Sequence, residues 1–142
     1  MASEDAVQPR RMEPPASEVA KPFWDATREE RLVLQWCNDC GAAIFYPREV
    51  CPSCLRSDAI EWRPASGRGQ VYAVSVQHEP QMRMPAYEPP YAVAVVELEE
   101  GVRMLSTIVG TDPESVRVGQ AVTVAWERLT DGRNLPLFQP TS

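Results

Sequence analysis

All four cysteines of this 142-residue chain lie within residues 37–54, as two C-x2-C pairs separated by ten residues. A two-residue gap lets successive thiolates converge on one ion from a tight turn. Gly41 follows the second cysteine, at a position where a left-handed backbone conformation is often needed. Two such turns supply a tetrahedral shell of four sulfurs, which is typical of a structural zinc site. We therefore predict that one metal ion is bound by Cys37, Cys40, Cys51 and Cys54.

Other interpretations of the four cysteines have less support from the sequence. Two disulfides would need an oxidising compartment, and a C-x-x-C redox centre would leave the second pair unexplained. Iron in a rubredoxin-like site of four sulfurs stays open, because geometry alone does not separate it from zinc. A filled shell of four thiolates leaves no open coordination position, so we expect the metal to be structural and not catalytic.

The cellular compartment is predicted from the absence of two sequence features, a membrane-spanning segment and a secretory signal. No segment approaches the roughly 18 consecutive apolar residues that span a bilayer. The first 20 residues, MASEDAVQPRRMEPPASEVA, also lack the apolar stretch of a secretory signal. We therefore expect a cytoplasmic protein that does not engage a membrane.

The first third of the chain divides into three segments. Residues 1–20 are polar and aperiodic, which predicts a disordered leader. Pro22 and the early acidic residues of PFWDATREERLVLQ predict a short helix over about 23–31, inside an N-terminal helical segment of residues 21–35. Residues 36–63 form the cysteine module, with the strand-like pieces AAIFY and AIEWR.

Residues 64–142 have the pattern of a small β-barrel. The glycine-containing segment SGRGQ reads as a hinge. Segments 91–98 and 102–109 flank Glu-Glu-Gly, which predicts a hairpin, and 121–129 places Val122, Val124 and Trp126 on one side. Four or five short strands in this length suit an OB-fold. The segment before the hairpin alternates, with one face formed by Tyr72, Val74, Val76 and His78.

The sequence offers no convincing catalytic set. His78 is the chain's one histidine. Its two interpretations are a general base and a strand-end residue bonded to the backbone, and the second is favoured because no Ser or Cys nucleophile motif accompanies it. The run Gly67-Arg68-Gly69 is too short to form a phosphate-binding loop.

Several apolar side chains are candidates for contact with a partner. Phe23 and Trp24 are too apolar to remain exposed together, so they dock either as a cap on the next module or on a partner. The proline-rich connection 81–91 either contacts a partner or folds back over the barrel mouth. It carries Met82, Met84 and Tyr87. The segment NLPLFQP, residues 134–140, reads as an extended C-terminal tail anchored by Phe138.

These motifs together resemble the DUF35 family. The resemblance rests on PFWDATREERLVLQWCNDCG, YPREVCPSC, SGRGQVYAVSVQH, PPYAVAVVELEEGVR and LPLFQP, and it extends from about Pro22 to Pro140. It implies a mostly β protein with a short N-terminal helix, a rubredoxin-like zinc ribbon over residues 36–63 and a small OB-fold barrel over 64–142. Members of the family accompany thiolase-superfamily enzymes of acyl-CoA chemistry, and the catalytic residues belong to the thiolase-like chain.

The resemblance therefore implies a non-catalytic accessory subunit in a hetero-oligomer with a thiolase-like aldolase or acyltransferase. The reaction would make or break a carbon–carbon bond of an acyl-CoA thioester, and retro-aldol cleavage of a steroid side-chain CoA is one candidate. Direct contact with CoA is a further hypothesis, because its phosphates need positive charge. The arginines to test for that role are Arg48, Arg56 and Arg68.

The alternative is a single-stranded nucleic-acid-binding module, since zinc ribbons and OB barrels often serve that purpose. Such a module needs a basic groove with stacking aromatic side chains. The formal net charge is −6, lysine occurs once, and residues 64–142 hold 6 basic and 9 acidic residues. The charge balance therefore disfavours nucleic acid as the partner.

Overall fold

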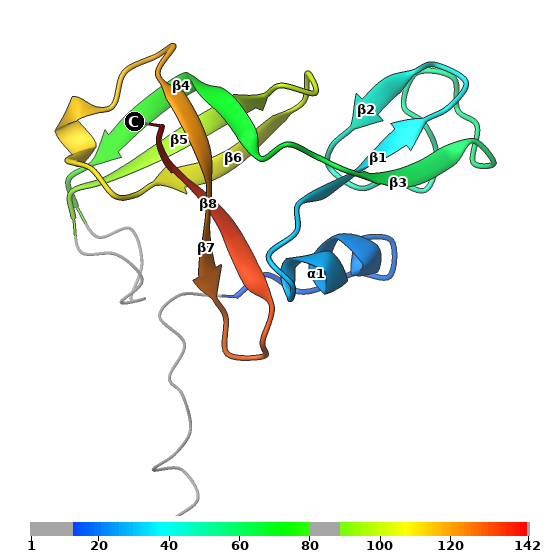
Figure 1. Cartoon of the computed structure of the whole chain (residues 1–142), viewed down its shortest axis with the longest axis horizontal. Coiled ribbons are helices and arrows are strands. Elements are labelled where there is room, and N and C mark those ends of the chain that lie inside the picture. Colours follow the sequence, from blue (N-terminus) through cyan, green and yellow to red (C-terminus); the bar gives the residue numbers. More distant parts are fainter. Residues whose placement is uncertain (1–12, 80–88, 142) are drawn as a thin grey trace, which may run out of the picture.

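The computed structural model describes residues 13–79 and 89–141 of the chain. Two β-sheets form the framework of the described part, and one short α-helix lies beside them (Figure 1). The elements are α1 (Lys21–Thr27), β1 (Val33–Cys37), β2 (Ala42–Ile44), β3 (Ile60–Pro64), β4 (Arg68–Gln77), β5 (Tyr91–Leu98), β6 (Arg103–Ile108), the 3-10 helix η2 (Pro113–Ser115), β7 (Ala121–Arg128) and β8 (Asn134–Pro140). The prediction of a mostly β protein with a short N-terminal helix is confirmed.

Helix α1 is shorter than the sequence indicates. It begins at Lys21 and ends at Thr27, whereas the sequence pattern extends to residue 31. The next residues form a tight turn, with the N–H of Glu30 bonded to the carbonyl of Thr27. Glu30 has φ 55°, a left-handed conformation that ends the helix and turns the chain toward β1. Local composition favoured a longer helix, but the helix ends at Thr27 because the chain must turn there to enter β1.

Part of the predicted leader lies on the barrel. Residues 13–20 are described, and they include a turn over 18–20 just before α1. The Glu13 carboxylate accepts hydrogen bonds from the backbone N–H and the hydroxyl of Thr130, at 3.0 and 2.7 Å. This segment therefore contacts the turn between β7 and β8. The first 12 residues lie outside the described part.

The cysteine module is a three-stranded antiparallel sheet of order β2-β1-β3. Strand β1 is central, and its last residue, Cys37, lies opposite Ala42 of β2 and Ile60 of β3. The sheet therefore places the first C-x2-C pair in the turn between β1 and β2.

The second sheet is a closed barrel of order β4-β5-β6-β8-β7, with β7 pairing back to β4. This is the expected OB-fold. The predicted hairpin is formed by β5 and β6, and Gly101 takes a φ of 92° in the turn between them. Strands β6 and β8 run parallel and pair only at Ile108 and Phe138, so the barrel has an open seam between them.

The predicted C-terminal tail is in fact strand β8, an integral part of the barrel. It pairs with β7 along its whole length and buries Phe138 completely. Its prolines are tolerated because of the open seam. The carbonyl of Pro136 accepts a hydrogen bond from the Ser106 hydroxyl on β6. The backbone N and C=O of one residue in a strand point to the same side of that strand. The nitrogen of Pro136 therefore faces β6, so its missing N–H removes no hydrogen bond from the pairing with β7.

Strand β4 departs from the predicted alternation. Its pairing with β5 shifts register between Val71 and Ala73, which is a β-bulge at Tyr72. The bulge turns Val71, 1% exposed, into the core and leaves Tyr72 47% exposed. Val74 and Val76 stay partly buried as expected, but Tyr72 is not on their face. A regular period of two could not reveal the extra residue.

The helix and the base of the ribbon share one hydrophobic core with the barrel. Phe23 of α1 and Leu34 of β1 belong to the same buried cluster as Val96 and Phe138 of the barrel. In Figure 1 the cysteine end of the ribbon points away from the barrel, where it has a small core of its own. None of the helices in the described part of the chain has the length and apolar character needed to cross a bilayer.

Candidate functional site

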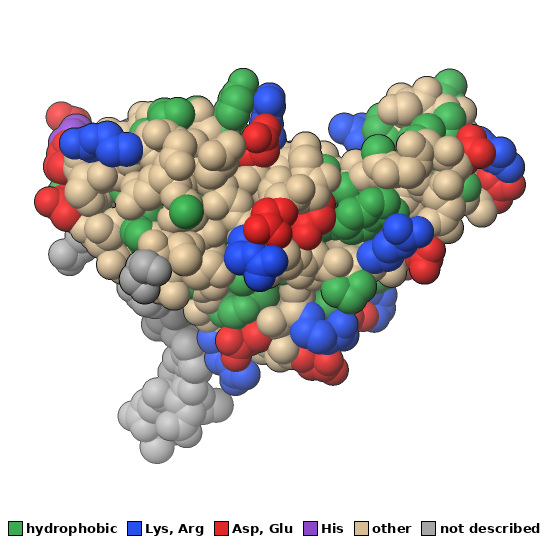
Figure 2. Space-filling model, turned by 45° about the horizontal axis from the view of Figure 1, so that its top comes forward, with side chains coloured by type: hydrophobic (Ala, Val, Ile, Leu, Met, Phe, Trp, Pro, Cys, Tyr) green, Lys and Arg blue, Asp and Glu red, His purple; other side chains and the backbone are tan. Residues whose placement is uncertain are grey.

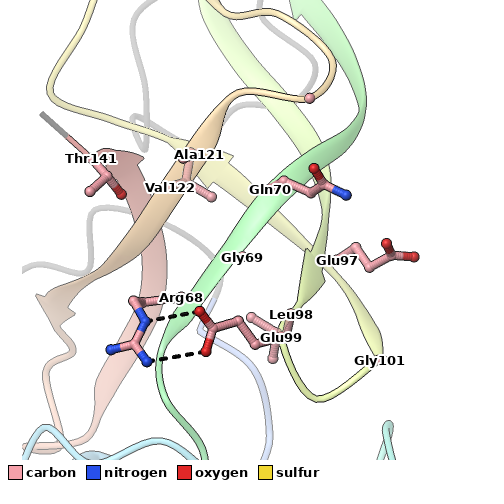
Figure 3. A pocket seen from close by; sticks show the side chains of 11 residues that line it. Arg68, Gly69, Gln70, Glu97, Leu98, Glu99, Gly101, Ala121, Val122 and Thr141 are labelled. Carbon is pink, nitrogen blue, oxygen red and sulfur yellow. Dashed lines mark hydrogen bonds and ion pairs between the residues drawn. The ribbon is translucent and has the colours of Figure 1, made fainter.

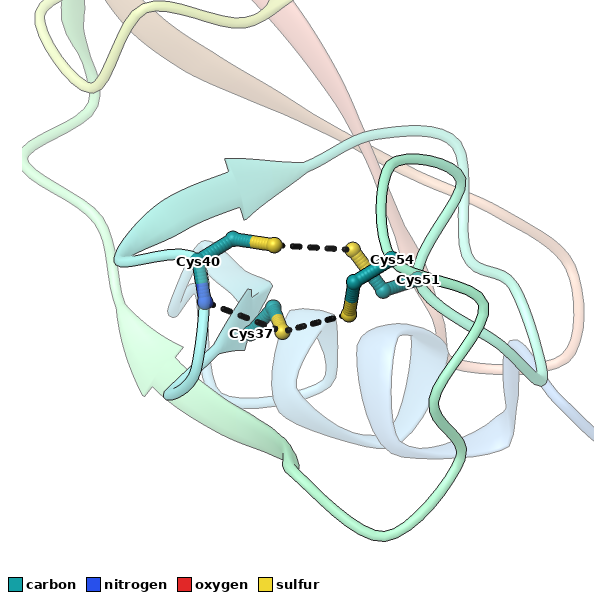
Figure 4. Close-up of side chains that lie close together, drawn as sticks. All are labelled: Cys37, Cys40, Cys51 and Cys54. Carbon is teal, nitrogen blue, oxygen red and sulfur yellow. Dashed lines mark hydrogen bonds between the residues drawn. The ribbon is translucent and has the colours of Figure 1, made fainter.

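The two C-x2-C pairs form matching turns at the far end of the ribbon (Figure 4). In the first, the N–H of Gly41 bonds to the carbonyl of Cys37 at 2.7 Å, and Gly41 has the predicted left-handed φ of 72°. In the second, the N–H of Leu55 bonds to the carbonyl of Cys51 at 2.8 Å, and Leu55 has φ 65°. Both turns therefore use a left-handed residue directly after the second cysteine, although the second one is not a glycine.

The four sulfurs have the spacing of a tetrahedral metal shell. All four Sγ atoms lie within 4.8 Å of one another. The Cys37–Cys54 and Cys40–Cys51 sulfur pairs are 3.7 and 3.8 Å apart. A tetrahedral site with Zn–S bonds of about 2.3 Å requires sulfurs about 3.8 Å apart, whereas a disulfide requires about 2.05 Å. The cluster fits zinc, and a bound zinc ion would cross-link the two turns.

The surroundings of the four sulfurs shift the pKa values of Cys40 and Cys51 in opposite directions. Hydrogen bonds from the backbone N–H groups of Cys54 and Ser53 lower the pKa of Cys51 to about 6. Hydrogen bonding to the Cys54 and Cys51 thiols, together with desolvation, raises the pKa of Cys40 to about 12. Cys51 is buried and Cys40 is exposed. Cys51 is therefore the sulfur that the backbone favours as a thiolate, while Cys40 forms the solvent-facing corner.

Two of the three candidate CoA arginines are paired with carboxylates. Arg56 lies 3.1 Å from Asp58 and 3.5 Å from Asp39. Arg68 donates two hydrogen bonds to Glu99, at 3.0 and 3.2 Å (Figure 3). These carboxylates raise the pKa of both guanidinium groups.

Arg48 differs from them. Its backbone N–H and carbonyl are held by the Gln35 side chain, at 2.7 and 2.9 Å. Its guanidinium is exposed and makes no ion pair within the described residues. Of the three arginines, Arg48 therefore keeps its charge available to an outside anion.

A groove of about 510 Å³ crosses the outside of the barrel over β5, β4 and β7, beside Arg68. Figure 3 shows the Arg68–Glu99 pair and the Glu97 side chain among the residues that line this groove. The groove gathers more negative than positive charge and so does not suit a polyphosphate. On the face that Figure 2 draws, basic and acidic side chains are interspersed and no continuous basic surface is seen.

The residues predicted to contact a partner differ in their exposure to solvent. Phe23 is buried in the chain's own core, against Trp24 and Phe45, and so presents no surface to a partner. Trp24 is partly buried. Met82, Met84 and Tyr87 lie outside the described residues.

Sequence reasoning missed an exposed apolar group near the junction of ribbon and barrel. Leu105 on β6 is 60% exposed, and its N–H bonds to the hydroxyl of Tyr46 from the ribbon, at 3.4 Å. Tyr46 is itself 53% exposed. On β4, the ring of Tyr72 lies 3.7 Å from the guanidinium carbon of Arg103. The bulge and the contact between ribbon and barrel create this group, and neither has a local sequence signal.

Within the part of the chain that the structure describes, the partner of His78 is a carboxylate and not the backbone group that was favoured for it. Its Nε2 lies 3.3 Å from a carboxylate oxygen of Glu114 in the 3-10 helix η2, and both side chains are exposed. The histidine is therefore an exposed residue at a strand end, beside a carboxylate.

The fold and the cysteine cluster define a two-part protein, a rubredoxin-like zinc ribbon joined to an OB-fold. The family model described as "ChsH2, rubredoxin-like zinc ribbon domain" matches residues 24–61. The model described as "ChsH2, C-terminal OB-fold domain" matches residues 62–127. The chain belongs to the DUF35 family, as its motifs indicate.

Similar proteins carry several names. The chain is 38% identical over 138 residues to a probable enoyl-CoA hydratase alpha subunit of Thermomonospora curvata, covering 95% of this chain and 40% of that protein. It is 38% identical over 95 residues to a DUF35 domain-containing scaffold protein of Methanocaldococcus jannaschii, covering 67% of each. It is 34% identical over 115 residues to the 3-oxo-4,17-pregnadiene-20-carboxyl-CoA hydratase alpha subunit of Mycobacterium tuberculosis, covering 81% of this chain and 36% of that protein.

Solved structures include one that is similar in both fold and sequence. A chain of the Ltp2-ChsH2(DUF35) aldolase superposes with a TM-score of 0.80 at 34% identity, covering 90% of this chain and 98% of that one. The chain therefore corresponds to almost the whole of that subunit, whereas it spans about 40% or less of the two hydratase alpha subunits.

Proposed function

We propose that this protein is a non-catalytic accessory subunit of a cytoplasmic thiolase-superfamily enzyme, an aldolase or acyltransferase acting on acyl-CoA thioesters. The observation that carries the proposal is the similarity to the chain of the Ltp2-ChsH2(DUF35) aldolase, over nearly the full length of both. A steroid side-chain CoA is the substrate we favour for the complex, since one relative is named for a pregnadiene carboxyl-CoA.

The cysteine cluster supports a structural role. Four sulfurs fill a tetrahedral shell and leave no coordination position for a substrate. Iron in the same shell is the alternative to zinc. The metal would hold the end of the ribbon rigid, while the shared core fixes its base to the barrel. A rigid two-part surface suits a protein that positions a partner.

The partner surface that we propose is the exposed apolar group of Tyr46, Tyr72 and Leu105. Tyrosine is enriched in protein interfaces, and an arginine such as Arg103 is a frequent neighbour there. Arg103 is paired with Glu97 at 3.0 Å, so the surface carries little net charge. It therefore suits an apolar protein surface better than a phosphate backbone. Trp24, Met82, Met84 and Tyr87 remain candidates for contact with the partner.

Contact with CoA itself is a second part of the proposal. Arg48 is the candidate whose charge is available, whereas Arg56 and Arg68 would first have to leave their carboxylates. We therefore propose Arg48 as the residue that approaches the phosphates of CoA in the complex.

The test is co-expression with a thiolase-like protein from the same organism. We expect a stable hetero-oligomer by light scattering, and cleavage or formation of a carbon–carbon bond on an acyl-CoA only when both chains are present. Leu105→Asp should abolish assembly, whereas Val118→Asp, at an exposed aliphatic residue in the turn before β7, should not. Turnover of a thioester by the isolated chain would contradict the proposal, and salt-dependent binding of single-stranded DNA would favour the nucleic-acid alternative.

A further inference from the structure

Strand β3 is an outer strand of the ribbon sheet. Within residues 13–79 and 89–141 only β1 pairs with it, and Figure 1 shows it at the border of that sheet. An outer strand has backbone N–H and C=O groups that no neighbouring strand satisfies, so it can pair with another chain. Neither the cysteine cluster nor the exposed group of Tyr46, Tyr72 and Leu105 lies on β3.

Two hydrogen bonds at the ends of β3 show which of its residues face outward. The N–H of Asn38 donates to the carbonyl of Ala59, and the N–H of Ala65 donates to the carbonyl of Leu32, both at 2.8 Å. In an antiparallel ladder, such bonded pairs alternate with pairs whose N–H and C=O groups point away from the partner strand. The odd-numbered residues of β3 therefore bond to β1, and the backbone groups of its even-numbered residues point outward.

The outward edge of β3 is regular over its five residues, since the pairing with β1 has no register shift. Ile60 and Trp62 each present an N–H and a C=O on this edge. Pro64 presents a C=O alone, because proline has no N–H. The edge therefore offers backbone donors and acceptors at the spacing of an extended polypeptide.

The side chains of β3 are complementary to those of a second β3. Glu61 and Arg63 flank Trp62, point to the face opposite its ring, and are exposed. When two copies of β3 pair antiparallel about a two-fold axis at Trp62, Glu61 of each copy lies directly opposite Arg63 of the other. These positions are the non-hydrogen-bonded pairs of the new ladder, where side chains are closest and opposite charges favour pairing.

We propose that β3 pairs with β3 of a second copy of this chain, in an antiparallel register centred on Trp62. The two Trp62 residues exchange two backbone hydrogen bonds, and the N–H of each Ile60 donates to the Pro64 carbonyl of the other copy. A two-fold contact uses the same surface on both copies, so assembly stops at two chains. Five residues of edge make a small interface, so the dimer forms and dissociates with protein concentration.

Charge reversal tests this register with the full chain and no partner enzyme. Sedimentation equilibrium at concentrations that reach about 1 mM, the Kd of a weak complex, should show the wild type moving from the mass of one chain toward twice that mass. Glu61→Arg and Arg63→Glu each place like charges opposite one another, so either variant alone should dimerise at least about tenfold more weakly. An equimolar mixture of the two should form a heterodimer, because every arginine then lies opposite a glutamate.

The mixture separates contact between copies from contact within one chain. Arg63 also donates to Glu61 of its own chain at 3.3 Å, and both variants lose that bond equally. Glu114→Arg makes the same change of charge in η2 of the barrel and is the control, which should dimerise like the wild type.

NMR locates the contact on the chain. The amide signals of Ile60 and Trp62 should shift with protein concentration, whereas that of Leu105 should not. A wild type that stays monomeric throughout, a mixture that does not dimerise, or shifts at Leu105 in place of Trp62 would each overturn the proposal and leave the proposed accessory function standing. Protection of the Ile60 and Trp62 amides from hydrogen exchange only in a complex with the thiolase-like protein would assign this edge to that protein and not to a second copy.

Discussion

Asn134, the first residue of β8, donates its side-chain amide to the carbonyl oxygen of Thr27, the last residue of α1, at 2.8 Å. The backbone N–H of Asn134 also reaches the Thr27 hydroxyl, at 3.2 Å. Both residues are buried, and they lie 107 positions apart in the chain. This pair joins the N-terminal helix to the last strand of the barrel and gives the buried carbonyl of Thr27 a second donor beside the N–H of Glu30.

Asn134→Ala should destabilise the protein by about 0.5–1.5 kcal/mol, because it removes a buried hydrogen bond and leaves the Thr27 carbonyl with the Glu30 N–H as its donor. Urea unfolding followed by circular dichroism measures the change. Asn38→Ala is the matched control, since Asn38 bonds Glu61 and Arg63 on the exposed surface of the ribbon. A loss in Asn134→Ala no larger than that of the control would show that the pair does not hold the helix.

Removal of the metal should unfold the end of the ribbon. We expect one zinc ion per chain by native mass spectrometry, and zinc binding at such a site is worth on the order of 10 kcal/mol. Chelation, or Cys51→Ser, should remove the dispersed NMR signals of residues 37–60. Ser53→Ala lies between two ligands but keeps its backbone N–H, so it should retain zinc and the signals. Persistence of the ribbon signals in metal-free protein would contradict the structural role.

Asp131→Asn should destabilise the protein by about 1–2 kcal/mol at pH 7. The buried Arg133 loses its counter-charge, but Asp131 is half exposed and solvent screens the pair. The folded pKa of Asp131 is lowered below the unfolded value of about 3.9. The stability from its carboxylate is therefore complete above the unfolded pKa and is lost as the pH falls through the folded pKa.

The difference in unfolding free energy between the wild type and Asp131→Asn should therefore shrink when the pH is lowered below about 4. Asp58→Asn is the control, since Asp58 pairs with Arg56 on the exposed surface, and its effect should be smaller than that of Asp131→Asn. A difference between wild type and Asp131→Asn that stays constant from pH 7 to pH 2.5 would rule out the ion pair as its cause.

Two glycines should respond to alanine for different reasons. In Gly69→Ala the new Cβ would lie 2.4 Å from the carbonyl oxygen of Glu97, so β4 must move away from β5, at a cost of about 3 kcal/mol. Gly41→Ala meets no atom within 4 Å and costs about 1 kcal/mol through its left-handed backbone alone. Thermal unfolding ranks the two. The reverse order would show that the strands do not approach as closely as the structure has them.

The sequence alone indicated the features that depend on neighbouring residues. The spacing of the four cysteines specified the two turns, because a C-x2-C pair closes locally whatever the rest of the chain does. The hairpin of β5 and β6 followed from alternation on both sides of Glu-Glu-Gly. Both predictions needed no knowledge of distant partners.

Other features depended on the tertiary structure. Two prolines made residues 134–140 look like a tail, but an open seam beside β8 removes the penalty for their missing N–H groups. The bulge at Tyr72 placed Val71 in the core and left Tyr72 exposed, and pairing with Glu99 engaged the charge of Arg68.

A cavity of about 300 Å³ lined by Trp24 and Arg133 has the same origin, since its walls come from residues 16–18, helix α1 and the turn between β7 and β8. Sequence period and motif spacing record how each segment prefers to fold. Which strand lies beside a proline, and which carboxylate meets an arginine, is decided only when segments far apart in the chain pack together.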